Sequence, residues 1–296
     1  MKIGIIGLGD IGGNLAAWLA SCGHEVTGYD IDPAAAARAA ARGVTPAGSR
    51  AELVERAEVI VTSLADLAAV RTTYFAEDGL IALAGAGRVT VECSTLPPDL
   101  ARQITAARCA GGGVAIEAAV IGIGKDALAG QLYLMAAGDP ASIERARPFL
   151  DAAGRGWLLT GASGTAAIAK VLNNGVGAAT LCAIAEALAL AAHHGIAPAT
   201  LVEAMRTGAG AGASVVLDRH GAFMAEAEAS TRPFNPIASK DAAALGALLP
   251  DAVATALPML AGMVATYRET LTDAGAAAPE VLTRCAHRRL KDATST

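Results

Sequence analysis

Three glycines and one aspartate near the start of the chain have the spacing of a phosphate-binding turn. The segment Gly7-Leu8-Gly9-Asp10-Ile11-Gly12 follows the apolar run Ile3–Ile6 and precedes a helix expected over 14–22, and Asp30 ends the next expected strand. A G-x-G-x-x-G turn between a strand and a helix presents backbone N–H groups and the positive end of the helix dipole to a diphosphate. The segment therefore predicts a dinucleotide site lined by residues 7–12.

Each of these residues has a physical role in such a site. Gly7 permits the tight turn, Gly9 lets the backbone approach the diphosphate, and Gly12 lets the helix pack closely on the strand. The Asp30 carboxylate can accept hydrogen bonds from both ribose hydroxyls but would repel a 2′-phosphate, and Ile31-Asp32-Pro33 supplies no arginine to bind one. The pattern favours NAD over NADP, with FAD or another nucleotide-bearing ligand as the alternative.

Lys170 and Asn174 form a second candidate pair, in a long apolar stretch. Their spacing of four residues places both side chains on one face of a helix. We expect them near the start of that helix, just past a domain boundary, where a cleft should form. A lysine there can hold a substrate oxygen and transfer a proton, and the asparagine amide can bind the polar end of the substrate. The alternative for Lys170 is a solvated charge on an alanine-rich helix.

The elements that must position these residues differ between the two halves of the chain. In the first half, short β-like runs alternate with alanine-rich helical stretches, which favours a mostly parallel sheet covered on both faces. Strands are expected at 2–7, 25–30, 59–64, 89–92, 114–119 and 132–136, and helices at 14–22, 33–41 and 49–56. The fold class is therefore α/β, with an N-terminal Rossmann-type doubly wound sheet.

The second half predicts an all-α domain built on one long helix. That helix is expected over 164–194, with further helices at 198–206, 241–248 and 258–274 and a loose end after Lys291. The predicted domains are residues 1–161, which bind the dinucleotide, and residues 162–296, which serve the substrate and oligomerisation. So much apolar helical surface predicts a homodimer or homotetramer.

Composition and charge exclude several classes of partner and site. The 296 residues carry a formal net charge of −5 without a basic run, which argues against nucleic acid and anionic membrane surfaces. The first apolar run is interpreted as a strand and not as a signal peptide, and no segment is interpreted as membrane-spanning. Because the five cysteines are scattered, no disulfide and no metal site is predicted. We expect a cytoplasmic protein.

The motifs are similar to those of the β-hydroxyacid dehydrogenase family, which includes 3-hydroxyisobutyrate dehydrogenase and the larger 6-phosphogluconate dehydrogenases. The resemblance covers most of the chain. The family's lysine-helix pattern G-x-x-x-K-x-x-N-N is present at 166–174, with Ala166 in place of the glycine. The other matching segments are the glycine turn at 7–12, a looser loop at Ser63-Leu64-Ala65, the S-T segment Ser94-Thr95 and the late pair Lys240-Asp241.

The resemblance implies roles for individual residues. Lys170 would be the general acid/base, and Asn174 would assist it at the substrate. The segment Ile121-Gly122-Ile123 would contact the substrate. Beyond the glycine turn and Asp30, the implied cofactor contacts are Leu64, Ala65, Thr95 and Lys240, the last at the nicotinamide end.

The substrate segment departs from the family pattern. Ile121 stands where relatives place a serine on the substrate carboxylate, and Ile123 replaces a glycine. An apolar side chain makes no hydrogen bond, and an unpaired carboxylate in a dry site is costly. Either backbone N–H groups around Gly122 and Gly124 compensate, together with Lys125, or the substrate is larger and less polar.

Three functions follow from these observations. The leading hypothesis is an NAD-dependent dehydrogenase that oxidises a small-molecule β-hydroxy acid, or reduces the matching semialdehyde, with Lys170 as general acid/base. An imine-reductase-like enzyme would suit the apolar Ile121 and Ile123, although such enzymes usually prefer NADP. The third alternative, a non-catalytic NAD-binding protein, would explain the altered substrate segment but not the presence of both Lys170 and Asn174.

Overall fold

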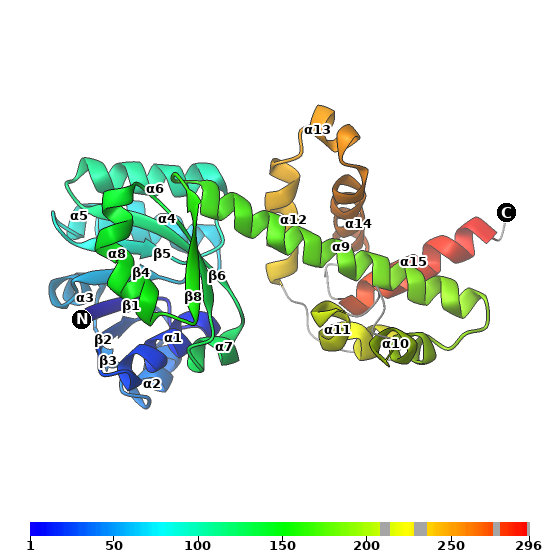
Figure 1. The fold of residues 1–296 in the computed structure, drawn as a ribbon, viewed down its shortest axis with the longest axis horizontal. Helices are drawn as coiled ribbons and strands as arrows, with labels where there is room; N and C mark the ends of the chain where they lie inside the picture. The colour runs from blue at the N-terminus through cyan, green and yellow to red at the C-terminus, as the bar shows by residue number, and fades with distance from the viewer. Residues whose placement is uncertain (208–213, 228–235, 275–278, 295–296) are drawn as a thin grey trace. The chain divides into compact units, whose positions relative to one another are not determined.

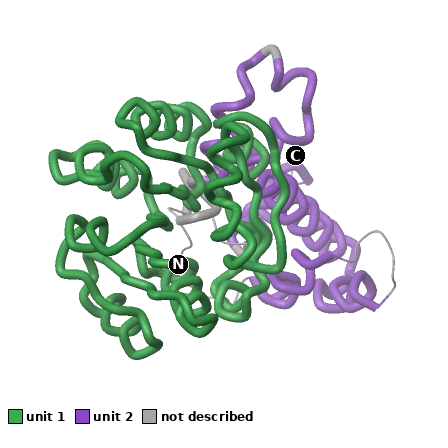
Figure 2. The backbone as a smooth tube through the Cα atoms, turned by 60° about the vertical axis from the view of Figure 1, so that its left-hand side comes forward, with its two compact units in different colours: residues 1–170 green, residues 171–296 purple. Residues whose placement is uncertain are grey.

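The structure, a computed structural model, describes residues 1–207, 214–227, 236–274 and 279–294. It contains two compact units, residues 1–170 and residues 171–296 (Figure 2). The division falls inside one long helix, α9 (Thr165–His193), so this helix contributes residues to both units. The boundary between residues 161 and 162 stays a prediction.

The first unit is built on a single sheet of eight strands (Figure 1). In chain order they are β1 (Lys2–Ile6), β2 (Glu25–Tyr29), β3 (Thr45–Pro46), β4 (Val59–Thr62), β5 (Val89–Glu92), β6 (Val114–Ile121), β7 (Tyr133–Ala137) and β8 (Gly156–Gly161). Their order across the sheet is β3-β2-β1-β4-β5-β6-β7-β8. Neighbouring strands are parallel except β6 and β7, which are antiparallel. The predicted Rossmann-type sheet is confirmed.

Helices cover both faces of this sheet. They are α1 (Asp10–Ser21), α2 (Pro33–Ala40), α3 (Arg50–Arg56), α4 (Leu67–Phe75), α5 (Leu80–Leu83), α6 (Pro98–Ala110), α7 (Gly124–Leu128) and α8 (Pro140–Ala152). On one face Ile5 of β1 packs in a cluster with Leu15 of α1 and Phe149 of α8, and on the other Ile6 packs in a cluster with Leu53 of α3. Because both faces are buried, the strands are continuous apolar runs rather than alternating ones.

In the first unit, the sequence expectation left out two strands and the helices α4 to α8, and it started one helix too late. Helix α1 begins at Asp10, four residues before the expected start, because the helix forms directly from the glycine turn. The strands β3 and β8 were not predicted. β3 has only two residues, and on the edge strand β8 Leu158 and Leu159 are 42% and 53% exposed, so neither carries the pattern of a buried strand.

The second unit is helical throughout its described part. Its elements are the rest of α9, α10 (Pro198–Thr207), α11 (Val215–Ala225), α12 (Pro236–Ala247), α13 (Asp251–Ala256), α14 (Pro258–Ala274) and α15 (Pro279–Thr294). Val171, Ala185 and Leu188 of α9 lie in its core with Leu245 and Tyr267. The all-α prediction is confirmed. The loose end expected after Lys291 is wrong, because α15 continues to Thr294.

Helix α9 has the length and apolar composition of a membrane span. The core helix of a soluble protein has the same properties, and α9 supplies buried residues to the core of the second unit. We therefore interpret α9 as a core helix of the second unit.

Candidate functional site

The predicted cofactor residues of the first unit lie at one edge of the sheet. β1, β2, β4, β5 and β6 are parallel, so the loops that follow them leave from the same edge. The strand order reverses direction between β1 and β4. In open α/β sheets, ligands bind outside the carboxyl ends of the strands at this reversal. The glycine turn follows β1 and the Leu64-Ala65 loop follows β4, so both border it.

The glycine turn has the geometry that a dinucleotide requires. Gly7 has φ +91°, and a Cβ there would lie 2.3 Å from the Ser63 carbonyl oxygen. A Cβ on Gly12 would lie 2.0 Å from the Gly7 carbonyl oxygen, so only glycine lets α1 start this close to the turn. A Cβ on Gly9 would meet no atom within 4 Å. The turn is thus closed on the protein side and open at Gly9, which fits a diphosphate at the N-terminus of α1.

Asp30 is fixed by the backbone of the same turn. Its Oδ2 accepts a hydrogen bond from the Leu8 N–H at 2.6 Å, and its Oδ1 accepts one from the Asp32 N–H at 2.8 Å. Each carboxylate oxygen has two lone pairs, so each can still accept a second hydrogen bond. The carboxylate is therefore held in place beside the turn with acceptor capacity for two ribose hydroxyls.

The loops after β4 and β5 are joined by Ser94. Its hydroxyl accepts a hydrogen bond from the Leu64 N–H at 2.9 Å, and its own N–H donates to Glu92 Oε1 at 2.5 Å. Ala65 and Thr95 follow these bonded residues, so the bonds fix the backbone from which both predicted cofactor contacts extend.

Glu92 is a buried acid beneath those loops. Thr62 donates from its hydroxyl to Glu92 Oε2 at 2.8 Å, and the Tyr74 hydroxyl lies 2.8 Å from the same Thr62 oxygen. Burial raises the pKa of the Glu92 carboxyl above its ordinary value, partly offset by the hydrogen bonds from Ser94 and Thr62. Burial and the nearby Glu92 charge raise the pKa of Tyr74 as well. The cluster joins β4, β5 and α4 beneath the two loops.

The substrate segment leaves the carboxyl end of β6. Ile121 is half-buried and Gly122 has φ +137°. The next two N–H groups are bonded within the protein: Ile123 N–H donates to Asp126 Oδ2 at 2.9 Å, and Gly124 N–H donates to Asp10 Oδ2 at 3.1 Å. Asp10, in the first turn of α1, therefore connects the glycine turn to the substrate segment.

Lys170 is half-buried on the second turn of α9. The preceding turn packs on the sheet through small residues: Ala166 is buried in a cluster with Ala119 of β6, and both Ala169 and Ile121 pack against that cluster. The turn that carries Lys170 therefore lies beside the end of β6, where the substrate segment begins.

Asn174 is held by an acid of the second unit. Its Nδ2 donates to Asp241 Oδ2 at 2.7 Å, and its Oδ1 accepts from Asn173 Nδ2 at 3.2 Å. Asp241 lies on α12, next to Lys240 in the chain. The side chain of Lys240 lies outside the described residues, so its predicted cofactor contact stays a prediction.

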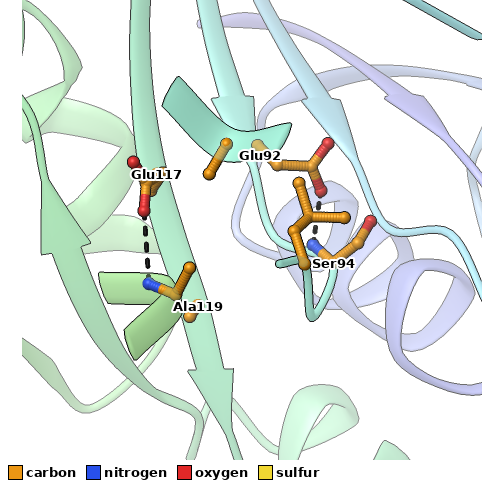
Figure 3. A pocket seen from close by; sticks show the side chains of 7 residues that line it. Glu92, Ser94, Glu117 and Ala119 are labelled. Atoms are coloured by element: carbon orange, nitrogen blue, oxygen red, sulfur yellow. Dashed lines mark hydrogen bonds between the residues drawn. The ribbon is translucent and has the colours of Figure 1, made fainter. Parts of the chain in front are cut away.

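A small cavity lies on the face of β5 and β6 that α6 and the start of α9 cover. Glu92 and Glu117 are paired residues on these strands, and both carboxylates border the cavity (Figure 3). Its volume is about 10 Å³, close to the minimum for one water molecule, so it is too small for a hydroxy acid. The remaining lining residues are Ser94, Leu96, Ala101, Ala119 and Ala167.

Comparison with known proteins decides the family. Residues 2–170 match the family described as the NAD binding domain of 6-phosphogluconate dehydrogenase, and residues 164–281 match that described as NAD-binding of NADP-dependent 3-hydroxyisobutyrate dehydrogenase. The chain belongs to the 3-hydroxyisobutyrate dehydrogenase family. As a member, it is a nicotinamide-dependent oxidoreductase that acts on CH–OH groups, as predicted.

Individual members of the 3-hydroxyisobutyrate dehydrogenase family match most of the chain. The 3-hydroxyisobutyrate dehydrogenase of Pseudomonas aeruginosa is 35% identical over 208 residues, 70% of each chain. The NAD-dependent L-serine dehydrogenase of the same organism is 35% identical over 209 residues, 71% of this chain and 70% of the relative. The solved 3-hydroxyisobutyrate dehydrogenase of Mycobacterium tuberculosis with L-serine has a TM-score of 0.78 at 29% identity, covering 96% of this chain and 98% of its own.

Three acids at the candidate site of this 3-hydroxyisobutyrate dehydrogenase family member were missed in the sequence analysis. Glu92 and Glu117 were seen only as members of longer motifs, and Asp241 only as the partner of Lys240. For the first two a signal exists: each is an acid inside an otherwise apolar strand, and acids are rarely buried unless they are bonded. Among the described residues, no group of three or more His, Cys, Asp or Glu side chains is arranged to hold a metal ion.

Proposed function

We propose that the enzyme oxidises a β-hydroxy acid, or reduces the matching semialdehyde, with NAD as cofactor and Lys170 as general acid/base. The observation that carries this proposal is the packing of the Lys170 turn of α9 beside the end of β6 and Ile121. Family membership supports the reaction class, and the geometry of the glycine turn supports the cofactor class.

The choice of NAD over NADP rests on Asp30. Its carboxylate is held by two backbone N–H groups beside the glycine turn. That arrangement suits the free 2′-hydroxyl of NAD, whereas a 2′-phosphate would bring a second negative charge to the same place. Gly7, Gly9 and Gly12 would hold the diphosphate, and Leu64, Ala65, Thr95 and Lys240 would line the rest of the cofactor.

In this proposal two residues of α9 act on the substrate. In the oxidation, the Lys170 amine accepts the proton of the substrate hydroxyl, and in the reduction it returns that proton to the carbonyl oxygen. The Asn174 amide, oriented by Asp241, hydrogen-bonds the polar end of the substrate. Bound NAD supplies the hydride acceptor.

The substrate segment supports a substrate with an apolar group beside Ile121. Two of the backbone N–H groups that would replace the family serine, those of Ile123 and Gly124, already donate to Asp126 and Asp10. A carboxylate placed there would lack both of these donors, and an incompletely paired carboxylate is costly. We therefore infer a β-hydroxy acid larger than the smallest members of the class.

A cofactor-reduction screen tests the reaction and the substrate together. We expect NAD-dependent turnover with β-hydroxy acids, rising with the size of the apolar substituent. Turnover only with cyclic imines would favour an imine reductase, and NADH binding without turnover on any alcohol, hydroxy acid or imine would favour a non-catalytic protein. Either result would refute the proposal.

Lys170 variants test the acid/base role. Lys170→Arg keeps the charge but cannot release its proton at neutral pH, and Lys170→Ala removes the group. Both should lower kcat by about 100-fold or more, while the Kd for NAD measured by calorimetry stays within about twofold of the wild type. Lys291→Met, an exposed site on α15, is the matched control. Normal turnover in Lys170→Ala would overturn the assignment.

We also propose a cytoplasmic homodimer or homotetramer. Apolar side chains on α9 are exposed in the single chain: Leu172 by 44%, Val176 by 64% and Leu190 by 50%. Soluble proteins usually cover such surfaces. A solution mass equal to one chain would contradict the assembly.

A further inference from the structure

Glu117 is a buried acid that bonds the N-terminus of the helix carrying Lys170. Its side chain is on β6 and is 3% exposed. Oε1 accepts hydrogen bonds from the Ser163 hydroxyl at 2.7 Å and from the Gly164 N–H, and Oε2 accepts one from the Ala167 N–H at 3.2 Å. One carboxylate therefore receives two of the N–H groups that the start of a helix leaves without partners.

The other polar contacts of this helix start do not reach β6: the Thr165 hydroxyl lies 2.8 Å from that of Thr160 on β8 and donates to the Ala162 carbonyl at 2.7 Å. Against β6 itself the remaining contacts are apolar. Ala166 and Ala167 are buried, at 0% and 5% exposure, against alanines and other apolar residues of the sheet. Contacts between methyl groups are non-directional, so they permit the helix to turn or slide slightly on the sheet. Hydrogen bonds to a carboxylate are directional, and they are strengthened here by the negative charge at the positive end of the helix dipole.

The same strand also carries the substrate segment. Ile121 lies four residues after Glu117 on β6, about 13 Å along the strand. Lys170 lies three residues after Ala167 on α9, about one helical turn further on. A shift of the helix relative to β6 would therefore move Lys170 relative to Ile121.

We propose that Glu117 is a positioning residue for the reaction. Its carboxylate fixes the rotation of α9 and its position along β6, and thereby the place of Lys170 relative to the substrate segment. This inference rests on the proposed function of Lys170. Because the Glu117 side chain is buried and bonded to the start of α9, it would act through the first turn of that helix. A catalytic group misplaced by 1 Å can lose about 100-fold in rate, so small changes at Glu117 should be visible in kcat.

Three substitutions grade the interaction. Glu117→Gln keeps the shape, but its amide cannot accept from both sides, so one bond and the charge are lost. Glu117→Asp keeps the charge on a side chain shorter by one methylene. Ser163→Ala removes one donor and leaves both backbone N–H groups bonded. The stability control is Asp139→Ala, which removes the cap of α8 at Ser142 on a helix with no candidate catalytic residue.

We expect kcat of Glu117→Gln to fall by about 100-fold, with Kd for NAD within about twofold of the wild type. The kcat of Glu117→Asp should be about tenfold higher than that of Glu117→Gln. The kcat of Ser163→Ala should be less than about tenfold below that of the wild type. Asp139→Ala should lower Tm without changing kcat. Assays are run at a temperature where circular dichroism shows every variant folded.

A double variant separates failure of this inference from failure of the proposed function. If Glu117 acts through Lys170, then Glu117→Gln should cause no further loss of kcat in the Lys170→Ala background. Unchanged kcat in Glu117→Gln, or full additivity in the double variant, would overturn the positioning role while Lys170 keeps its own. Normal turnover in Lys170→Ala alone would instead overturn the acid/base assignment.

Discussion

Replacing Asp30 with asparagine should change the cofactor preference of the enzyme. Asparagine has nearly the same shape, and its amide oxygen can keep one of the two backbone hydrogen bonds, from Leu8 or Asp32. The substitution removes the negative charge and one acceptor. NAD should therefore bind more weakly and NADP less unfavourably.

The magnitude follows from the charges and the bonds. A unit negative charge on Asp30 about 4 Å from a 2′-phosphate costs about 4 kcal/mol at an effective dielectric constant near 20. Because Asp30 is only half-buried, salt and water reduce this value, and we take about half of it. A hydrogen bond to a charged group stabilises by about 1 kcal/mol more than a neutral one. The sum of about 3 kcal/mol is a change of about 100-fold in the preference for NAD.

Steady-state kinetics with both cofactors measures this preference as the ratio of kcat/KM for NAD to that for NADP. Asp32→Asn is the matched control: it removes a neighbouring charge, and asparagine is as good a helix N-cap as the aspartate that caps α2. We expect the ratio to fall about 100-fold in Asp30→Asn and less than about threefold in Asp32→Asn. A ratio within about threefold of the wild type in Asp30→Asn would refute the reasoning.

Two further predictions concern the glycine turn and the buried acid. Gly9→Ala adds a methyl group that meets no protein atom, so Tm should change little. The Kd for NAD, measured by calorimetry, should rise by about tenfold or more because the methyl group blocks the diphosphate. An unchanged Kd would place the diphosphate elsewhere. The pKa of Glu92 in the folded protein is raised above its ordinary value of 4.5, so the folded state keeps the carboxyl proton to higher pH than the unfolded state does. The stability that this group contributes is therefore lost as the pH rises through its pKa in the folded state. Glu92→Gln has no proton to lose, so its Tm relative to the wild type should rise as the pH is raised above the ordinary carboxyl pKa of 4.5. A difference in Tm that does not change with pH would contradict the pKa direction.

The sequence predicted those parts of the fold that local physics determines. The turn at residues 7–12 requires glycine at Gly7 and Gly12 for reasons of backbone geometry, so its spacing alone indicates a strand, a turn and a helix. The strand β4 is four buried residues of high β propensity, which is why it was recognised. The long apolar run of α9 was predicted to within one residue at each end, because its composition alone favours a buried helix.

The parts that depend on contacts between distant residues could not be predicted. β8 is a strand because it pairs with β7, and its half-exposed leucines give no pattern of their own. Similarly, Glu117 bonds a helix that begins 48 positions later in the chain, at Thr165. Nothing near Glu117 in the sequence indicates which backbone groups will reach it, so its role was missed, and the only available signal was that of an acid inside an apolar strand.

The start of α9 inside the first unit determines how that unit can be isolated. A fragment ending with β8 would lack Ala166 and Ala167, so Ala119 and Ala137 would be exposed to water. The Glu117 carboxylate would also lose its backbone hydrogen-bond donors. Such a truncation should aggregate or misfold. The shortest autonomous nucleotide-binding fragment therefore extends through Lys170, and any chimera that exchanges this half with a relative should be joined beyond that residue.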